Sequence, residues 1–169
     1  AIKYAHRYGV KVYLTCNTLI YDEEVEEFLK FVRFAHQNGI DAVLIQDLGM
    51  YDLVHQKFPG LEIHASTQMH IHNLEGALVA RKLGFKRIVL ARETDIDTIK
   101  EIKEKTGLDV EVFVHGSLCV SYSGQCLFSS LLGGRSGNRG KCAGPCRLPY
   151  KLVENDKIIN SGYLLSTKD

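Results

Sequence analysis

Net charge, long apolar runs and a secretion pattern are scarce or missing in this sequence. Lysine and arginine total 21 against 20 aspartates and glutamates, so the net charge is only +1. This balance excludes a wholly basic nucleic-acid-binding domain and leaves room only for a local basic patch. No apolar run reaches the roughly 20 residues that a membrane helix needs, and no signal-peptide pattern opens the chain. We therefore predict a cytoplasmic protein without a membrane partner.

The chain also lacks the even set of cysteines that a secreted disulfide-bonded domain would carry. It has five cysteines, and four of them lie between positions 119 and 146. Such crowding of an odd number favours metal or thiol chemistry over a disulfide framework.

What the sequence does contain is an alternation of short β-branched runs with amphipathic helical stretches, most of which end near a glycine. The predicted strands are Val10–Cys16, Ala42–Ile45, Leu61–Ala65, Arg87–Ala91 and Val110–Val114. The predicted helices between them start at a cap on Asp22, around Tyr51, near Asn73 and at a cap on Thr94. Repeated βα units of this kind predict an α/β protein with a parallel sheet.

These units fit part of a TIM-type β/α barrel better than a dinucleotide-binding fold. A complete barrel takes about 250 residues, so 169 residues are too few to close one. Residues 1–8 also look like the end of a helix with no strand before it, which predicts an internal piece of a longer chain. A doubly wound sheet would alternate in the same way, but no predicted strand runs into a G-x-G-x-x-G turn. Residues 1–115 are therefore predicted to be an incomplete barrel.

Two further segments follow the predicted barrel section. Residues 116–149 lose the periodicity and are rich in glycine and cysteine, which predicts a long functional loop. Residues 150–169 predict a short hairpin or the start of a further segment. The expected hairpin strands are Tyr150–Glu154 and Lys157–Asn160, on either side of Asn155 and Asp156.

Polar residues stand where the predicted strands end, which is where barrel enzymes place their chemistry. These strand-end candidates, expected to gather at one end of the sheet, are Asn17, Asp47, Ser66–Gln68, Arg92, Glu93 and His115. Arg92 and Glu93 could hold an anionic substrate and move a proton, or they could form a local ion pair at the rim. His64, His70 and His72 fit a surface or rim role better than a metal site.

The most distinctive segment runs from Glu111 to Arg147. Its marked positions are Glu111, Phe113, the Gly116-Ser117 step, Cys119, Cys126, Ser129, and Asn138-Arg-Gly-Lys-Cys142-Ala-Gly-Pro-Cys146-Arg147. This pattern resembles the collagenase-like peptidase family, U thirty-two, and the segments 62–68 and 88–93 add to the resemblance. The family usually has an aliphatic residue where this chain has Phe128.

The resemblance implies a barrel enzyme but leaves its reaction open. The family is classed as peptidases of unknown catalytic type, and some members are described as collagen-degrading. Other members act in the hydroxylation of tRNA, ribosomal RNA or ubiquinone precursors and hold a four-iron cluster through cysteines. We favour iron–sulfur-dependent hydroxylation of RNA or of a small aromatic compound, with a true protease acting on peptide as the alternative.

The cysteines fit a [4Fe–4S] cluster, since thiolates are the usual ligands of such clusters. The candidate ligands are Cys119, Cys126, Cys142 and Cys146. Zinc is the alternative, although structural zinc sites usually show C-x₂₋₄-C pairs and the first two cysteines are seven apart. The resemblance associates the first three with the cluster, and the fourth ligand is either Cys146 or a cysteine beyond Asp169.

The remaining interpretations concern substrate, protease chemistry and self-association. Arg135, Arg139 and Lys141 form a basic strip that could follow a phosphate backbone, or a solvated loop. His115 lies four residues before Cys119 and could activate it as a nucleophile, but no Cys-His-Asn signature accompanies the pair. A third possibility is an inactive barrel piece whose exposed sheet edges pair with another chain.

Overall fold

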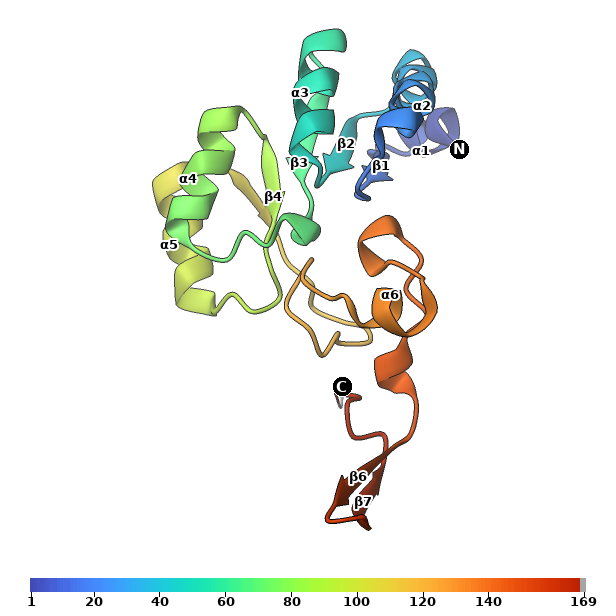
Figure 1. The fold of residues 1–169 in the computed structure, drawn as a ribbon. Coiled ribbons are helices and arrows are strands. Elements are labelled where there is room, and N and C mark those ends of the chain that lie inside the picture. Colours follow the sequence, from blue (N-terminus) through green and yellow to red (C-terminus); the bar gives the residue numbers. More distant parts are fainter. Residues whose placement is uncertain (168–169) are drawn as a thin grey trace.

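The computed structural model describes residues 1–167 and contains one parallel five-stranded sheet (Figure 1). The strands are β1 (Tyr13–Cys16), β2 (Ala42–Ile45), β3 (Glu62–Ala65), β4 (Arg87–Val89) and β5 (Asp109–Glu111). They follow one another across the sheet in chain order, β1-β2-β3-β4-β5, with β1 and β5 at the edges. This sequential order is that of a β/α-barrel wall, whereas a doubly wound sheet reverses its order. The predicted fold class is confirmed.

Helices connect the strands and form an arc around one face of the sheet (Figure 1). They are α1 (Ile2–Arg7), α2 (Val25–Gln37), α3 (Leu48–Lys57), α4 (Leu74–Leu83) and α5 (Ile96–Thr106). Short 3₁₀ turns lie at Asp22–Glu24 (η1) and Thr67–Met69 (η2). No helix within residues 1–167 is long and apolar enough to cross a membrane.

The helix starts follow side-chain capping, and two of the predicted caps are wrong. Asp95 caps α5, because its Oδ1 accepts a hydrogen bond from the Thr98 amide at 2.9 Å. Thr94 instead donates its hydroxyl to the carbonyl of Ala91 at 2.8 Å, which closes the turn after β4. Asp22 opens the 3₁₀ turn η1, and α2 begins only after it.

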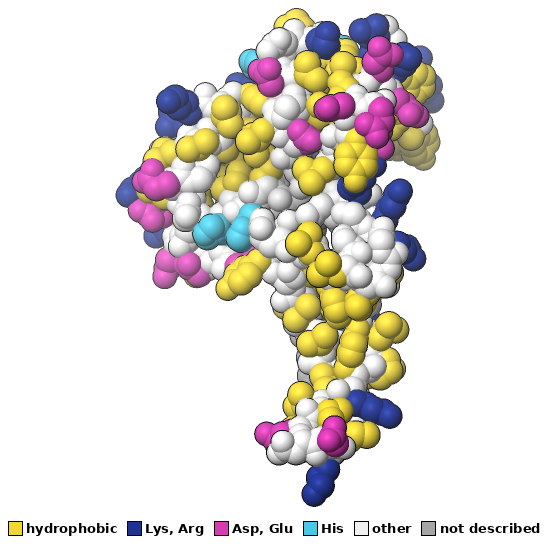
Figure 2. Space-filling view, in the orientation of Figure 1, with side chains coloured by type: hydrophobic (Ala, Val, Ile, Leu, Met, Phe, Trp, Pro, Cys, Tyr) yellow, Lys and Arg dark blue, Asp and Glu magenta, His cyan; other side chains and the backbone are white. Residues whose placement is uncertain are grey.

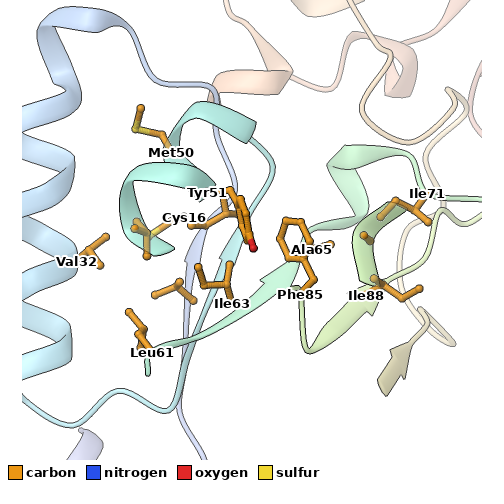
Figure 3. Packing of buried hydrophobic residues seen from close by; sticks show 14 of the residues in the cluster. Cys16, Val32, Met50, Tyr51, Leu61, Ile63, Ala65, Ile71, Phe85 and Ile88 are labelled. Atoms are coloured by element: carbon orange, nitrogen blue, oxygen red, sulfur yellow. The ribbon is translucent and has the colours of Figure 1, made fainter. Parts of the chain in front are cut away.

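Alternate strand residues pack against the helices and form the core. Ile45, Ala65 and Ile88 are in register on three neighbouring strands, and all three are fully buried. Across from them, the rings of Tyr51 and Phe85 pack with their centroids 4.3 Å apart (Figure 3). The apolar face that the sequence pattern predicts therefore holds the sheet and helices together.

The other face of the sheet is polar, and it corrects the interpretation of His64. This side chain is wholly buried in β3 and contacts Glu62 at 2.7 Å, so the predicted surface or rim role is wrong for it. On the adjacent strand, Arg87 pairs with Asp109 at 3.4 Å and with Glu111 at 3.5 Å. The strand period of two, which places residues 63 and 65 in the core, turns residue 64 to the opposite face.

Several strands are shorter than predicted, and the neighbouring contacts show why. β1 begins at Tyr13, since the amide of Val10 closes α1 by binding the carbonyl of Ala5 at 3.1 Å. β5 ends at Glu111, which is in register with the last residue of β4. Val112 and the two residues after it are exposed, with Val114 91% exposed.

Beyond the sheet come α6 (Phe128–Gly133), the 3₁₀ turns η3 (Gly137–Arg139) and η4 (Pro145–Arg147), and a hairpin of β6 (Tyr150–Glu154) and β7 (Lys157–Gly162). Asn155 and Asp156 both have positive φ, 48° and 60°, as a tight two-residue hairpin turn requires. The predicted hairpin is confirmed, and the last two residues of its predicted segment, 168–169, lie outside the described residues.

Candidate metal and substrate site

We call residues 116–149 the cysteine segment, and its four cysteines line one cavity of about 120 Å³. The thiols are those of Cys119, Cys126, Cys142 and Cys146, all unpaired. Thr67, Gln68 and Arg92, which follow β3 and β4, also line it. The segment lies across the strand ends (Figure 1), so the cavity forms at the carboxyl end of the parallel sheet.

A glycine allows the segment to approach the sheet closely. Gly124 has a φ of 74°, and a Cβ there would collide with the backbone carbonyl of Gln68. The Gly144 amide donates a hydrogen bond to the Cys142 sulfur at 3.3 Å. An amide aimed at a thiolate sulfur stabilises its negative charge, as at iron–sulfur ligands.

Arg92 and Glu93 bind the cysteine segment to the end of β4. The Arg92 guanidinium donates to the carbonyl of Ser121 at 3.2 Å, and Glu93 Oε1 accepts from the Ser123 amide at 2.8 Å. Partial burial would raise the pKa of Glu93, but hydrogen bonds from its own backbone and from Ser123 lower it below its usual value. Glu93 is therefore held as a carboxylate.

Arg92 also connects the cysteine cavity to a larger one. Its Nε is buried and has no hydrogen-bond partner among the described residues. The side chain lines a cavity of about 420 Å³ together with Phe113 and His115. That volume lies in the range of roughly 300 to 1,000 Å³ typical of small-molecule sites, whereas the cysteine cavity is below it. The structure thus sets Arg92 and His115 at one candidate substrate cavity.

The basic strip of the cysteine segment divides into one tethered and two exposed side chains. Arg139 forms a two-pronged ion pair with Glu24, with distances of 2.8 and 2.6 Å, and its guanidinium lies 3.8 Å from the centre of the Tyr21 ring. Through its hydrogen bond, Arg139 lowers the pKa of Glu24 to about 2. Arg135 and Lys141 are exposed, so they remain predicted substrate contacts.

The other strand-end residues lie at the same end of the sheet, in supporting roles. Asp47 caps α3 and also accepts from the Ile20 amide at 3.2 Å. Gln46, which the sequence did not single out, donates from its amide to the carbonyls of Asn17 at 2.9 Å and Asn138 at 3.0 Å. Its position directly after β2 is the sequence feature that could have identified it as a strand-end candidate. It connects β1, β2 and the cysteine segment.

Comparison with known proteins places the chain in a family. The sequence model of Peptidase family U32 matches residues 1–169, so the chain belongs to that family. A solved U32 peptidase structure superposes with a TM-score of 0.56 at 14% identity, covering 69% of this chain and 50% of the other, which supports the fold alone.

Curated relatives carry names from two kinds of chemistry. A 23S rRNA 5-hydroxycytidine synthase of Escherichia coli is 44% identical over 99% of this chain and 26% of its own length. A tRNA hydroxylation protein of Helicobacter pylori is 40% identical over 89% of this chain and 36% of its own length. A collagenase of Porphyromonas gingivalis is 34% identical over 95% of this chain and 42% of its own length. The chain therefore spans less than half the length of these relatives.

Proposed function

We propose that this chain is the cluster-binding part of an enzyme that hydroxylates bases of RNA. One observation carries the proposal: four thiols from separate points of the cysteine segment line a single small cavity at the carboxyl end of the sheet. This is the end at which β/α barrels place their active sites. The names of the E. coli and H. pylori relatives support RNA hydroxylation as the reaction class.

The donor set suits a four-iron cluster better than a zinc ion. Tetrahedral zinc holds sulfur at about 2.3 Å, which draws four thiolates into direct contact with one another. A cage of four irons spreads its thiolates around a larger body, as the cysteine cavity does.

The fourth ligand is assigned to Cys146. It lines the same cavity as the other three cysteines, and it lies on η4, which a Tyr150 hydroxyl fixes by donating to the Pro145 carbonyl at 2.9 Å. Cys16 is a contrasting thiol, because burial at the end of β1 raises its pKa to about 11 and keeps it protonated. Cys16 is therefore the natural control for ligand substitutions.

Bound in this cavity, a cluster supplies a redox centre next to the substrate. The chain's own residues provide the rest: Arg92 lines both cavities and has an Nε–H without a partner among the described residues, and His115 offers an imidazole ring at the larger one. Such donors position a base and its phosphate by hydrogen bonds and charge.

A cysteine protease is the weaker interpretation. A nucleophilic cysteine needs a histidine within hydrogen-bond reach. In the described residues, Cys119 and His115 line different cavities and no hydrogen bond joins them. Proteolysis is therefore supported by the names of the family and of the collagenase relative, and not by the arrangement of these two side chains.

The test is iron and sulfide analysis of the full-length protein purified without oxygen, for the parent and for Cys126→Ala, Cys146→Ala and Cys16→Ala. We expect about four irons per chain in the parent and in Cys16→Ala. Cys126→Ala and Cys146→Ala should lose the iron and the sulfide. Nucleoside mass analysis of cellular RNA, with and without the gene, tests the reaction.

Two results would overturn the proposal. Full iron content in both Cys126→Ala and Cys146→Ala would remove the cluster from these positions, whereas retention in Cys146→Ala alone would move the fourth ligand elsewhere. Unchanged RNA nucleosides together with gelatin cleavage that Cys119→Ala abolishes would establish the protease instead.

A further inference from the structure

Three aromatic rings form a continuous strip beside the cysteine cavity. The rings of His70 and His72 stack with their centroids 4.7 Å apart, and the ring of Tyr122 lies 5.8 Å from that of His70. The two histidines follow β3, whereas Tyr122 comes from the cysteine segment and lines the cysteine cavity. Histidine side chains are visible together on this face of the molecule (Figure 2).

These rings are held in the open rather than packed into the core. Tyr122 is 65% exposed and His72 is exposed as well. The His72 ring is fixed by a 2.9 Å contact between its Nδ1 and the His70 carbonyl.

The backbone at His70 ends η2 in a left-handed turn. Its φ is 57° and its ψ 37°, in a region that histidine adopts more often than most residues other than glycine. The two stacked histidine rings lie at this turn and two residues beyond it.

We propose that His70, His72 and Tyr122 form a stacking platform for unpaired bases that flank the target base of an RNA substrate. This inference rests on the proposed RNA hydroxylation and identifies how the same site would recognise single-stranded RNA. Unstacked bases in RNA loops bind through stacking on Phe, Tyr, Trp or His rings. Tyr122 also lines the cysteine cavity, so the platform extends up to that cavity. A base stacked on Tyr122 would place the neighbouring base of the RNA next to the cysteine cavity.

The platform offers the features that a single-stranded RNA segment needs. Imidazole and phenol rings present a π-face for stacking and also polar edges. Exposed cations for the phosphates, Arg135 and Lys141, lie on the same cysteine segment. Because these 169 residues carry a net charge of only +1, stacking has to supply a large share of the affinity that they contribute.

The experiment measures binding of the full-length protein to short single-stranded RNA of about 12 nucleotides with one 2-aminopurine, whose fluorescence is quenched on stacking. Tyr122→Leu keeps apolar bulk without a π-face, and Tyr122→Phe keeps the ring. His70→Asn removes a ring while tolerating the left-handed backbone. We expect Tyr122→Leu and His70→Asn to weaken binding roughly 5- to 150-fold with loss of quenching, and Tyr122→Phe to bind like the parent.

A matched control comes from α1, where Tyr4 is 66% exposed and packs 5.1 Å from Tyr8. Tyr4→Leu removes an equally exposed, ring-paired tyrosine and should leave binding unchanged. The platform is refuted if Tyr122→Leu, folded by circular dichroism, binds and quenches like the parent, or if it alters peptide cleavage and not RNA binding. Absence of hydroxylation with ring-dependent RNA binding would sink the proposed reaction and leave the platform standing.

Discussion

The sheet section, residues 1–111, and the cysteine segment, residues 116–149, are stabilised by different forces. Apart from Pro145, the buried hydrophobic side chains of the described chain come from residues 16–108. The cysteine segment buries Ser123, Ser129 and Pro145 and exposes its larger apolar side chains. Its exposed apolar residues include Leu118, Val120, Leu127, Leu131, Leu132 and Leu148. The first region is therefore held by apolar burial, and the second is not.

Polar contacts hold the cysteine segment to the sheet at a few points. They include the Ser123 contact with Glu93, the Arg139 pair with Glu24 and the Gln46 bridge to Asn138. A net hydrogen bond contributes only about 0.5 to 1.5 kcal/mol, so contacts of this kind keep a glycine-rich loop ordered only weakly. A bound cluster would supply the stabilisation that the cysteine segment does not gain from apolar burial, because metal binding adds directly to folding free energy.

The largest expected effect follows from removing iron. In hydrogen exchange of the anaerobic full-length protein, chelation should abolish protection of residues 116–147 and leave β2, β3 and β4 protected, since only the cysteine segment depends on a ligand. Cys126→Ala should reproduce the pattern without a chelator, and Cys16→Ala should not. Equal protection of the cysteine segment with and without iron would contradict the contrast between the two regions.

A core substitution should show the opposite pattern. Phe85→Ala removes a 2% exposed ring that packs on Tyr51, and it should lower the free energy of unfolding by about 3 to 5 kcal/mol. The matched change in the other region is Leu131→Ala, at a side chain that is 80% exposed, and it should stay within about 0.5 kcal/mol. Urea unfolding followed by circular dichroism measures both. A comparable loss for Leu131→Ala would reveal apolar burial in the cysteine segment.

The two regions also differ in how far the sequence predicts them. The sheet section has the periodic apolar pattern that burial imposes, so its strands, helices and fold class could be predicted, with errors at boundaries such as the Thr94 cap. His64 was misplaced because one strand position decides which face a side chain takes. In the cysteine segment, Arg139 reaches a partner 115 residues away in Glu24, and local sequence carries no signal for that.

The smallest expected effect is an acid-dependent loosening of this tether. Arg139 holds the pKa of Glu24 at about 2 in the folded chain, whereas an unfolded glutamate titrates near 4.3. A carboxyl with a depressed folded pKa contributes stability that is complete above the unfolded value and is lost as pH falls from about 5 to 2. The parent should therefore unfold at a higher temperature than Glu24→Gln at about pH 7.

That difference in melting temperature should shrink steadily as the full-length protein is melted at lower pH, and it should be nearly gone close to pH 2. Carboxyls elsewhere, such as Asp41 and Asp109, whose pKa values are also lowered, shift both proteins alike and cancel in the comparison. Glu26→Gln is the matched control, since Glu26 makes an exposed pair with Lys30 at 3.8 Å on the following helix. Exposed pairs of this kind contribute little, so Glu26→Gln should follow the parent at every pH. A gap between parent and Glu24→Gln that stays constant with pH would show that the Arg139 contact acts through packing on Tyr21 and not through its charge.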